Sequence, residues 1–180
     1  MMKQNRFLRL AAPVLVWAAL GCPVAAATVL PDFSAATFRP GAPITNRYFP
    51  TVPGPTAATI AKGESPDGPI EERGERSTLG EGPEILGVGT TTVLDRAIEN
   101  GLLVEETKDY YAQDSLGNVW YFGEDVTNYV YDEAGNLTGT NSSSSWRAGV
   151  SGALPGYIMP ADLQLRRSFF PRVCRHRQCT

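Results

Sequence analysis

The chain has 180 residues, of which 42% are hydrophobic, and it contains 18 glycines and 14 prolines. This length fits about one domain, and the glycine and proline content favours turns and short strands over long helices. The formal net charge of −3 averages unlike segments, because residues 28–161 contain 8 basic and 18 acidic side chains, a net charge of −10. An acidic body repels phosphate backbones, so nucleic acid is excluded as an expected partner.

The N-terminus has the three-part pattern of a secretory signal peptide. Residues 1–9 are basic, residues 10–20 are an apolar run, and Ala25-Ala26-Ala27 offers small residues for cleavage before Thr28. The apolar run is too short to span a bilayer as a helix. We therefore expect residues 1–27 to be a signal peptide and the mature protein to be exported, to the periplasm or outside the cell.

A second interpretation of the N-terminus remains open. Ala19-Leu20-Gly21-Cys22 resembles a bacterial lipoprotein box, in which Cys22 carries a lipid anchor and becomes the first residue of the mature chain. Ala19 stands where leucine is usual, and Pro23 follows the cysteine. Simple export is therefore the favoured interpretation, and lipidation at Cys22 is the alternative.

Residues 28–63 are rich in proline, and we interpret them as an N-terminal arm in which regular structure is short. The most apolar part of this arm, residues 44–50, is expected to anchor it to a sheet. Residues 64–84 are polar and rich in glycine. They include a turn sequence at residues 65–68 and a candidate exposed strand edge at Glu71-Glu72-Arg73.

The main sheet is predicted to begin near Leu86, because apolar residues alternate with small or polar ones from there to Ile98. Asn100-Gly101 predicts a hairpin turn. Alternation resumes over residues 102–112, which places Tyr110 on one face of the next strand and Asp109 on the other.

The densest stretch of the chain is residues 109–125, where five aromatic residues surround one turn and a carboxylate pair follows. Residues 114–118 have the chemistry of a type I turn with a bulge, and the same pattern recurs at residues 132–136. One strand between the two turns would be far longer than usual. We therefore expect a bulge or bend at Gly123 to break it and curve the sheet.

Residues 138–145 are polar and of low complexity, which favours a solvated loop, and residues 146–160 are apolar and rich in turns. Together these patterns predict a mostly β fold, an antiparallel meander in a curved, half-barrel-like sheet with little helix beyond the signal peptide. The predicted β domain covers residues 64–161.

Three segments resemble, in order and spacing, a family of uncharacterised secreted bacterial proteins. They are Ile44-Thr45-Asn46-x-Tyr48-Phe49-Pro50, the stretch from Tyr111 to Asp125, and the stretch from Ser145 to Ala161. The resemblance covers residues 44–161 and implies an exported, mostly antiparallel β fold. It implies no established activity, cofactor or catalytic residue. Where such proteins continue with a strand rich in Gly-Thr and aromatic residues, this chain has residues 53–58 instead.

Residues 162–180 differ abruptly from the body, with five arginines against one aspartate, the single histidine (His176), and two of the three cysteines. Family members continue beyond this point with an acidic, β-rich half. We therefore expect the domain to be truncated after residue 161 and the tail to be read in a shifted frame. The alternative is a genuine basic tail that docks on the acidic body. Cys174, His176 and Cys179 lack a fourth ligand, so no metal or cofactor is expected.

Six residues are candidates for a binding site on an aromatic sheet face: Tyr111, Trp120, Tyr121, Glu124, Asp125 and Trp146. Such a face would suit an apolar or glycan ligand, or a partner protein. Alternation places some of these aromatics on opposite faces, so most are expected to be core residues. The function predicted here is that of an exported, non-catalytic envelope protein of unknown role.

A carboxylate-type hydrolase that uses Asp114, Glu124 and Asp125 is the alternative function. The single histidine lies in the tail, which disfavours a hydrolase with a serine or cysteine nucleophile. A carboxylate mechanism needs one carboxyl group with a raised pKa in an apolar pocket. The two functions are therefore separated by whether Glu124 and Asp125 converge in a pocket.

Overall fold

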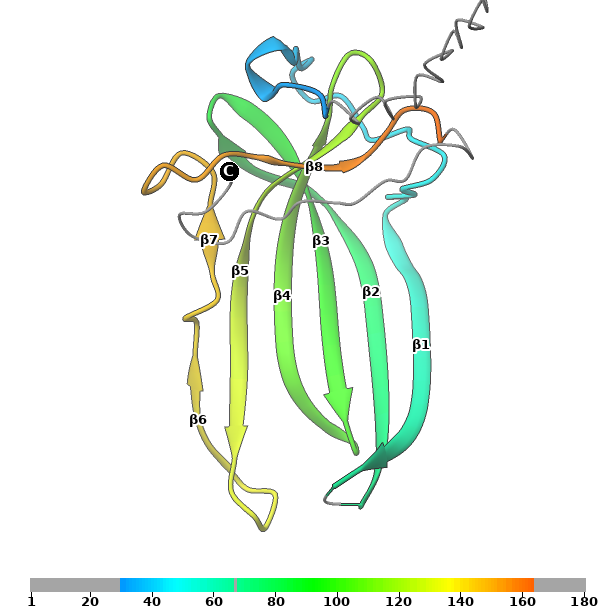
Figure 1. The fold of residues 1–180 in the computed structure, drawn as a ribbon, viewed down its shortest axis with the longest axis vertical. Helices are drawn as coiled ribbons and strands as arrows, with labels where there is room; N and C mark the ends of the chain where they lie inside the picture. The colour runs from blue at the N-terminus through cyan, green and yellow to red at the C-terminus, as the bar shows by residue number, and fades with distance from the viewer. Residues whose placement is uncertain (1–29, 67, 164–180) are drawn as a thin grey trace, which may run out of the picture.

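The structure is a computed structural model that describes residues 30–66 and 68–163. The expectations for the signal peptide, for Cys22 and for residues 164–180 lie outside this part of the chain. The described residues form one antiparallel sheet of eight strands, and the only helix among them is a 3-10 turn, Phe33–Ala35 (Figure 1). The predicted mostly β, antiparallel and open fold is confirmed.

The first six strands follow one another across the sheet in chain order, as a meander. They are β1 (Gly54–Ser65), β2 (Gly68–Ile85), β3 (Val88–Glu99), β4 (Leu102–Gln113), β5 (Val119–Tyr131) and β6 (Leu137–Asn141). Two short strands, β7 (Trp146–Arg147) and β8 (Gly156–Met159), also pair with β5. The outer edge of β5 is therefore covered in succession by β6, β7 and β8.

Strand β5 is not broken at Gly123, contrary to the expectation, and runs for 13 residues. The predicted bulge is present instead, because the register with β4 shifts between Tyr110 and Tyr111 opposite this glycine. Gly123 has φ +138, and a Cβ there would lie 2.9 Å from the Cα of Arg147. Glycine is thus required both by the backbone conformation and by the close approach of β7.

Three further segments differ from the expectations. Strand β1 begins at Gly54, so the part of the arm outside the sheet ends before it. Glu71–Arg73 lies in β2, between β1 and β3, rather than at a sheet edge. Residues 137–141 form the edge strand β6 although every one of them is exposed. Backbone pairing with β5 stabilises β6. Because no hydrophobic residue of β6 is buried, its sequence lacks the alternating pattern that usually predicts a strand.

The two Asp-x-x-Gly-Asn segments form the same turn, as predicted. In the first, Asp114 Oδ1 accepts hydrogen bonds from the backbone N–H groups of Leu116 and Asn118, both at 2.9 Å. In the second, Asp132 Oδ1 accepts the equivalent bonds from Ala134 and Asn136. Each aspartate therefore satisfies its own turn backbone, which explains why the pattern occurs twice.

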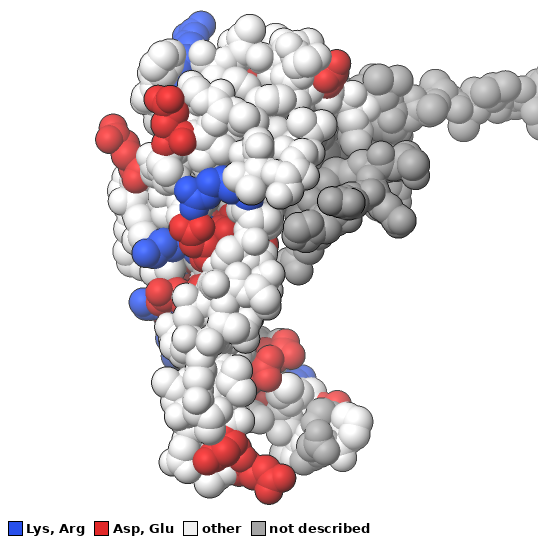
Figure 2. All heavy atoms as spheres, turned by 90° about the vertical axis from the view of Figure 1, so that its left-hand side faces the viewer, with Lys and Arg blue, Asp and Glu red and all other residues white. Residues whose placement is uncertain are grey.

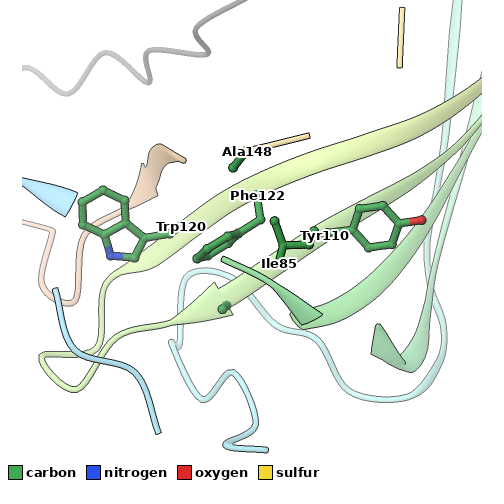
Figure 3. Close-up of a cluster of buried hydrophobic side chains, with 6 residues drawn as sticks. Ile85, Tyr110, Trp120, Phe122 and Ala148 are labelled. Carbon is green, nitrogen blue, oxygen red and sulfur yellow. The ribbon is translucent and has the colours of Figure 1, made fainter. Parts of the chain in front are cut away.

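The core consists of two clusters, one on each face of the sheet, at the end where the arm and β8 lie. The cluster on the Tyr110 face contains Ile85, Tyr110, Ala112, Trp120, Phe122 and Ala148 (Figure 3). Phe33 and Phe38 of the arm cover it, with ring centroids 5.8 and 5.6 Å from that of Phe122. The cluster on the Asp109 face contains Ile44, Val93, Tyr111, Val119 and Tyr121.

The arm and β8 contribute to both clusters, so they cover both faces of the sheet at this end. Residues 33–38 pack on the Tyr110 face, and Ile44 and Phe49 pack on the Asp109 face. In β8, Tyr157 packs on the Tyr110 face and Met159 packs on the Asp109 face. The strands extend well beyond this packed end and spread apart towards their far ends (Figure 1). In profile the molecule is narrowest between the packed end and the far ends of the strands (Figure 2).

Candidate functional site

The aromatic residues proposed for a binding face are mostly core residues. Trp120 is 2% exposed, and Tyr111 and Tyr121 are buried as well. Trp120 belongs to the cluster on the Tyr110 face, whereas Tyr111 and Tyr121 stack on the Asp109 face with ring centroids 4.9 Å apart. The described residues therefore present no open aromatic face that combines these side chains.

The three carboxylates proposed for a hydrolase do not share a pocket. Glu124 lies on the Asp109 face, opposite Asp109 on β4. Asp125 points to the other face, where it accepts hydrogen bonds from Tyr110, at 2.7 Å, and from Arg147. Asp114 is held in its turn, where its Oδ2 accepts 2.9 Å bonds from Asn118 and from the indole N–H of Trp120.

The structure instead brings together a different set of acidic groups on the Asp109 face. Asp109 and Glu124 form a direct cross-strand pair, and both are buried. The hydroxyl of Tyr121 contacts Asp109 and lies 2.7 Å from Glu124 Oε2. Asp95, one strand further on, lies close enough to act on the pKa of Asp109. We call Asp95, Asp109, Tyr121 and Glu124 the carboxyl cluster.

The carboxyl cluster must hold protons in addition to the phenolic one. A tyrosine hydroxyl has a single proton, so Tyr121 can donate only one of its two hydrogen bonds and must accept the other from a protonated carboxyl group. Like charges directly opposite each other in a sheet would otherwise repel.

The pKa values follow from this environment. Burial raises the pKa of Asp109 to about 7, and hydrogen bonding with Asp95 and the charges of Asp95 and Glu124 act in the same direction. The hydrogen bond that Asp109 accepts from Tyr121 opposes this rise. Burial, together with the charge of Asp109, also raises the pKa of Tyr121, so the phenol stays protonated.

Arg76 on β2 is the cation that faces this group. Its Nη1 lies 3.0 Å from Asp95 Oδ2, and each side chain of the pair is about one-third exposed. The guanidinium also lies 5.2 Å from the ring centroid of Phe49 and 5.8 Å from that of Tyr111. Arg76 and Asp95 thus connect the buried carboxyl cluster to solvent.

Below this ion pair, the Asp109 face has a groove of about 290 Å³, called here the β1–β4 groove. Thr59, Gly74, Ala97 and Glu105 are direct cross-strand neighbours on four successive strands. The next row contains Ala57, Arg76 and Asp95. Glu75 and Arg96 complete the lining, which thus combines small residues with five charged ones.

A second groove, of about 430 Å³, lies between the arm and the upper parts of β2 and β3. Its lining includes Gly41, Gly80, Gly82 and Gly89, with Glu81 and Glu84 as its charged members. Among the described residues no cation lines it, so this part of the chain gives it no counterpart to the paired donor and acceptor groups of the β1–β4 groove.

The residues that sequence reasoning missed are Arg76, Asp95 and Asp109. Alternation placed Asp109 on the correct face, but that face was expected to be polar. Asp109 is nevertheless buried, and Tyr121, whose hydroxyl contacts it, packs edge-on against Trp146 at 5.3 Å. One signal in the sequence could have predicted its place. Asp109 lies two residues before Tyr111, so both side chains lie on the same face of the strand.

Within residues 30–66 and 68–163, no group of three His, Cys, Asp or Glu side chains is placed to hold a metal ion. In the same part of the chain, no helix has the length and apolar character needed to cross a membrane. Comparison with protein-family models, with curated proteins and with solved structures found no match to this chain.

Proposed function

We propose that this chain is an exported, non-catalytic binding module that takes a small polar ligand in the β1–β4 groove. The observation that carries this proposal is the groove itself, at a part of the sheet that neither core cluster covers. Its volume of about 290 Å³ is near the lower limit of small-molecule sites, which suits one small ligand or one unit of a longer one.

The lining favours a neutral ligand with several hydroxyl groups, such as a sugar unit. Arg76 offers guanidinium donors, and Asp95 and Glu105 offer carboxylate acceptors. A hydroxyl group both donates and accepts, so a ring with neighbouring hydroxyls can satisfy both kinds of partner. Ala57, Gly74 and Ala97 give it an apolar floor on which to lie.

Nuclear magnetic resonance titration of the full chain with a panel of neutral mono- and oligosaccharides tests this proposal. We expect saturable shifts at the backbone amides of Ala57, Gly74 and Ala97. Ala97→Leu should abolish them, because the larger side chain fills the groove. Ala58→Leu is the matched control, since Ala58 lies on the opposite face of β1. If no sugar shifts these amides, or if both variants bind equally, the proposal is wrong.

One observation favours a carboxylate hydrolase as a second candidate, with residues other than those first considered. The pKa of Asp109 is raised to about 7, as a general acid requires, and its partner Asp95 lines the groove. Release of reducing ends from the same oligosaccharides, lost in Asp95→Asn but retained in Asp125→Asn, would support hydrolysis. Binding without any release would support the binding module alone.

A further inference from the structure

We propose that the carboxyl cluster is a pH-sensitive switch that holds β7 against β5 while it keeps its shared protons and loosens β7 when a proton is lost. This inference does not depend on what the β1–β4 groove binds. It rests on two buried carboxyl groups of β4 and β5 that share one phenol by hydrogen bonds, with Asp95 of β3 close enough to act on Asp109.

The charged and titratable groups that face Asp109 are few and mostly acidic. Strand β2 contributes Arg76, β3 contributes Asp95, β4 contributes Tyr111, and β5 contributes Tyr121 and Glu124. Arg76 is paired with Asp95 rather than with Asp109. Lys108, the neighbour of Asp109 in sequence, points to the other face. One cation therefore faces three carboxyl groups, and a further negative charge at Asp109 would be poorly balanced.

Strand β7 is the element most directly attached to this cluster. Trp146 pairs with Glu124 in the sheet register, and its ring packs against Tyr121. Strand β7 has only two residues, and Arg147 within it also pairs with Asp125 on the other face of the sheet. The indole N–H of Trp146 is also buried, and within the described residues it has no hydrogen-bond acceptor, which destabilises this position further.

Loss of a proton from the cluster breaks a hydrogen bond and places like charges side by side on neighbouring strands. The charged carboxylates are then more stable in contact with water than in the buried cluster. Strand β7 is the neighbour of the cluster that is most easily displaced, since β4 and β3 are each paired on both sides whereas β7 is a short edge strand. Local opening of β7 is therefore the expected response, ahead of global unfolding.

Amide hydrogen exchange of the full chain, corrected for the intrinsic pH dependence of exchange, tests this switch. Between about pH 5.5 and about pH 8.5, protection of residues 146–148 should fall about ten-fold more than that of Val93 in the centre of the sheet. Asp109→Asn cannot ionise and should remove this pH dependence. Glu106→Gln, a carboxyl removal on the opposite face of β4, should retain it.

If Asp109→Asn does not fold, Glu124→Gln replaces it, with Glu106→Gln again as the control on the other face. Protection of residues 146–148 that follows Val93 at every pH would overturn the proposal. It would also be overturned if the pH dependence persisted in Asp109→Asn or Glu124→Gln, because the cluster would then not be its source.

Discussion

Asp109 and Glu124 lie directly opposite each other on β4 and β5, and the hydroxyl of Tyr121 contacts both carboxyl groups. All three side chains are buried. Two acidic residues in this arrangement are stable only if the group retains protons that free carboxylates would lose at neutral pH. The chemistry of the Asp109 face, the wall of the groove and the attachment of β7 all depend on this pair.

The first prediction concerns stability against pH. The folded chain binds a proton at Asp109 up to about pH 7, whereas the unfolded chain releases it near pH 4. Ionisation of the unfolded state therefore lowers stability as pH rises from about 4 to about 7, by up to about 1.4 kcal/mol per pH unit. Asp109→Asn should flatten this decline in urea denaturation. An equally steep decline in the variant would contradict the assignment.

The second prediction concerns the phenol. Tyr121→Phe removes the hydroxyl between the two carboxyl groups and leaves them without this hydrogen-bond partner. We expect a loss of about 1–3 kcal/mol of unfolding free energy, the usual cost of an unsatisfied buried polar group. Tyr48→Phe is the control, because Tyr48 belongs to neither core cluster and lies in the arm. Equal midpoints for Tyr121→Phe and the wild type would show that the hydroxyl contributes nothing.

The third prediction concerns Trp120, which is 2% exposed and donates its indole N–H to Asp114. Trp120→Ala removes a large core side chain and leaves a cavity, so we expect a cost of about 3–5 kcal/mol. Chemical denaturation measures it. A denaturation midpoint close to that of the wild type would mean that Trp120 is not a core residue.

The fourth prediction concerns Gly123. Gly123→Ala places a Cβ at φ +138 and 2.9 Å from the Cα of Arg147, so β7 or β5 must shift. We expect a loss of about 1–3 kcal/mol, the range for local backbone strain. Gly139→Ala in β6, where a Cβ meets nothing within 4 Å, is the matched control and should be close to neutral. Similar thermal midpoints for the two variants would contradict the close approach of β7.

Local patterns in the sequence predicted those features that local physics determines. Asn100-Gly101 is a hairpin turn with φ values of +48 and +86, and the Asp114 and Asp132 turns satisfy their own backbones. Alternation placed Tyr110 and Asp109 on opposite faces. Each of these features depends on residues within one strand or turn.

The features that were missed depend on contacts between distant segments. Asp109 is buried beside Tyr121, which packs against Trp146 of the distant β7, so its burial leaves no mark in its own strand. Strand β6 has no apolar face, since all five of its residues are exposed, and therefore resembles a loop in sequence. The β1–β4 groove combines small residues from separate strands, and none of them is unusual alone.

A carbon-13 nuclear magnetic resonance titration of the aspartate carboxyl groups tests most directly whether this face holds a proton at neutral pH. We expect the carboxyl carbon of Asp109 to titrate with a midpoint near 7, and that of Asp132, whose pKa is lowered by hydrogen bonds from Asn136, to titrate below the ordinary aspartate range. Asp132 thus serves as an internal reference. A midpoint for Asp109 near 4, the value of an ordinary aspartate, would contradict the shared-proton cluster.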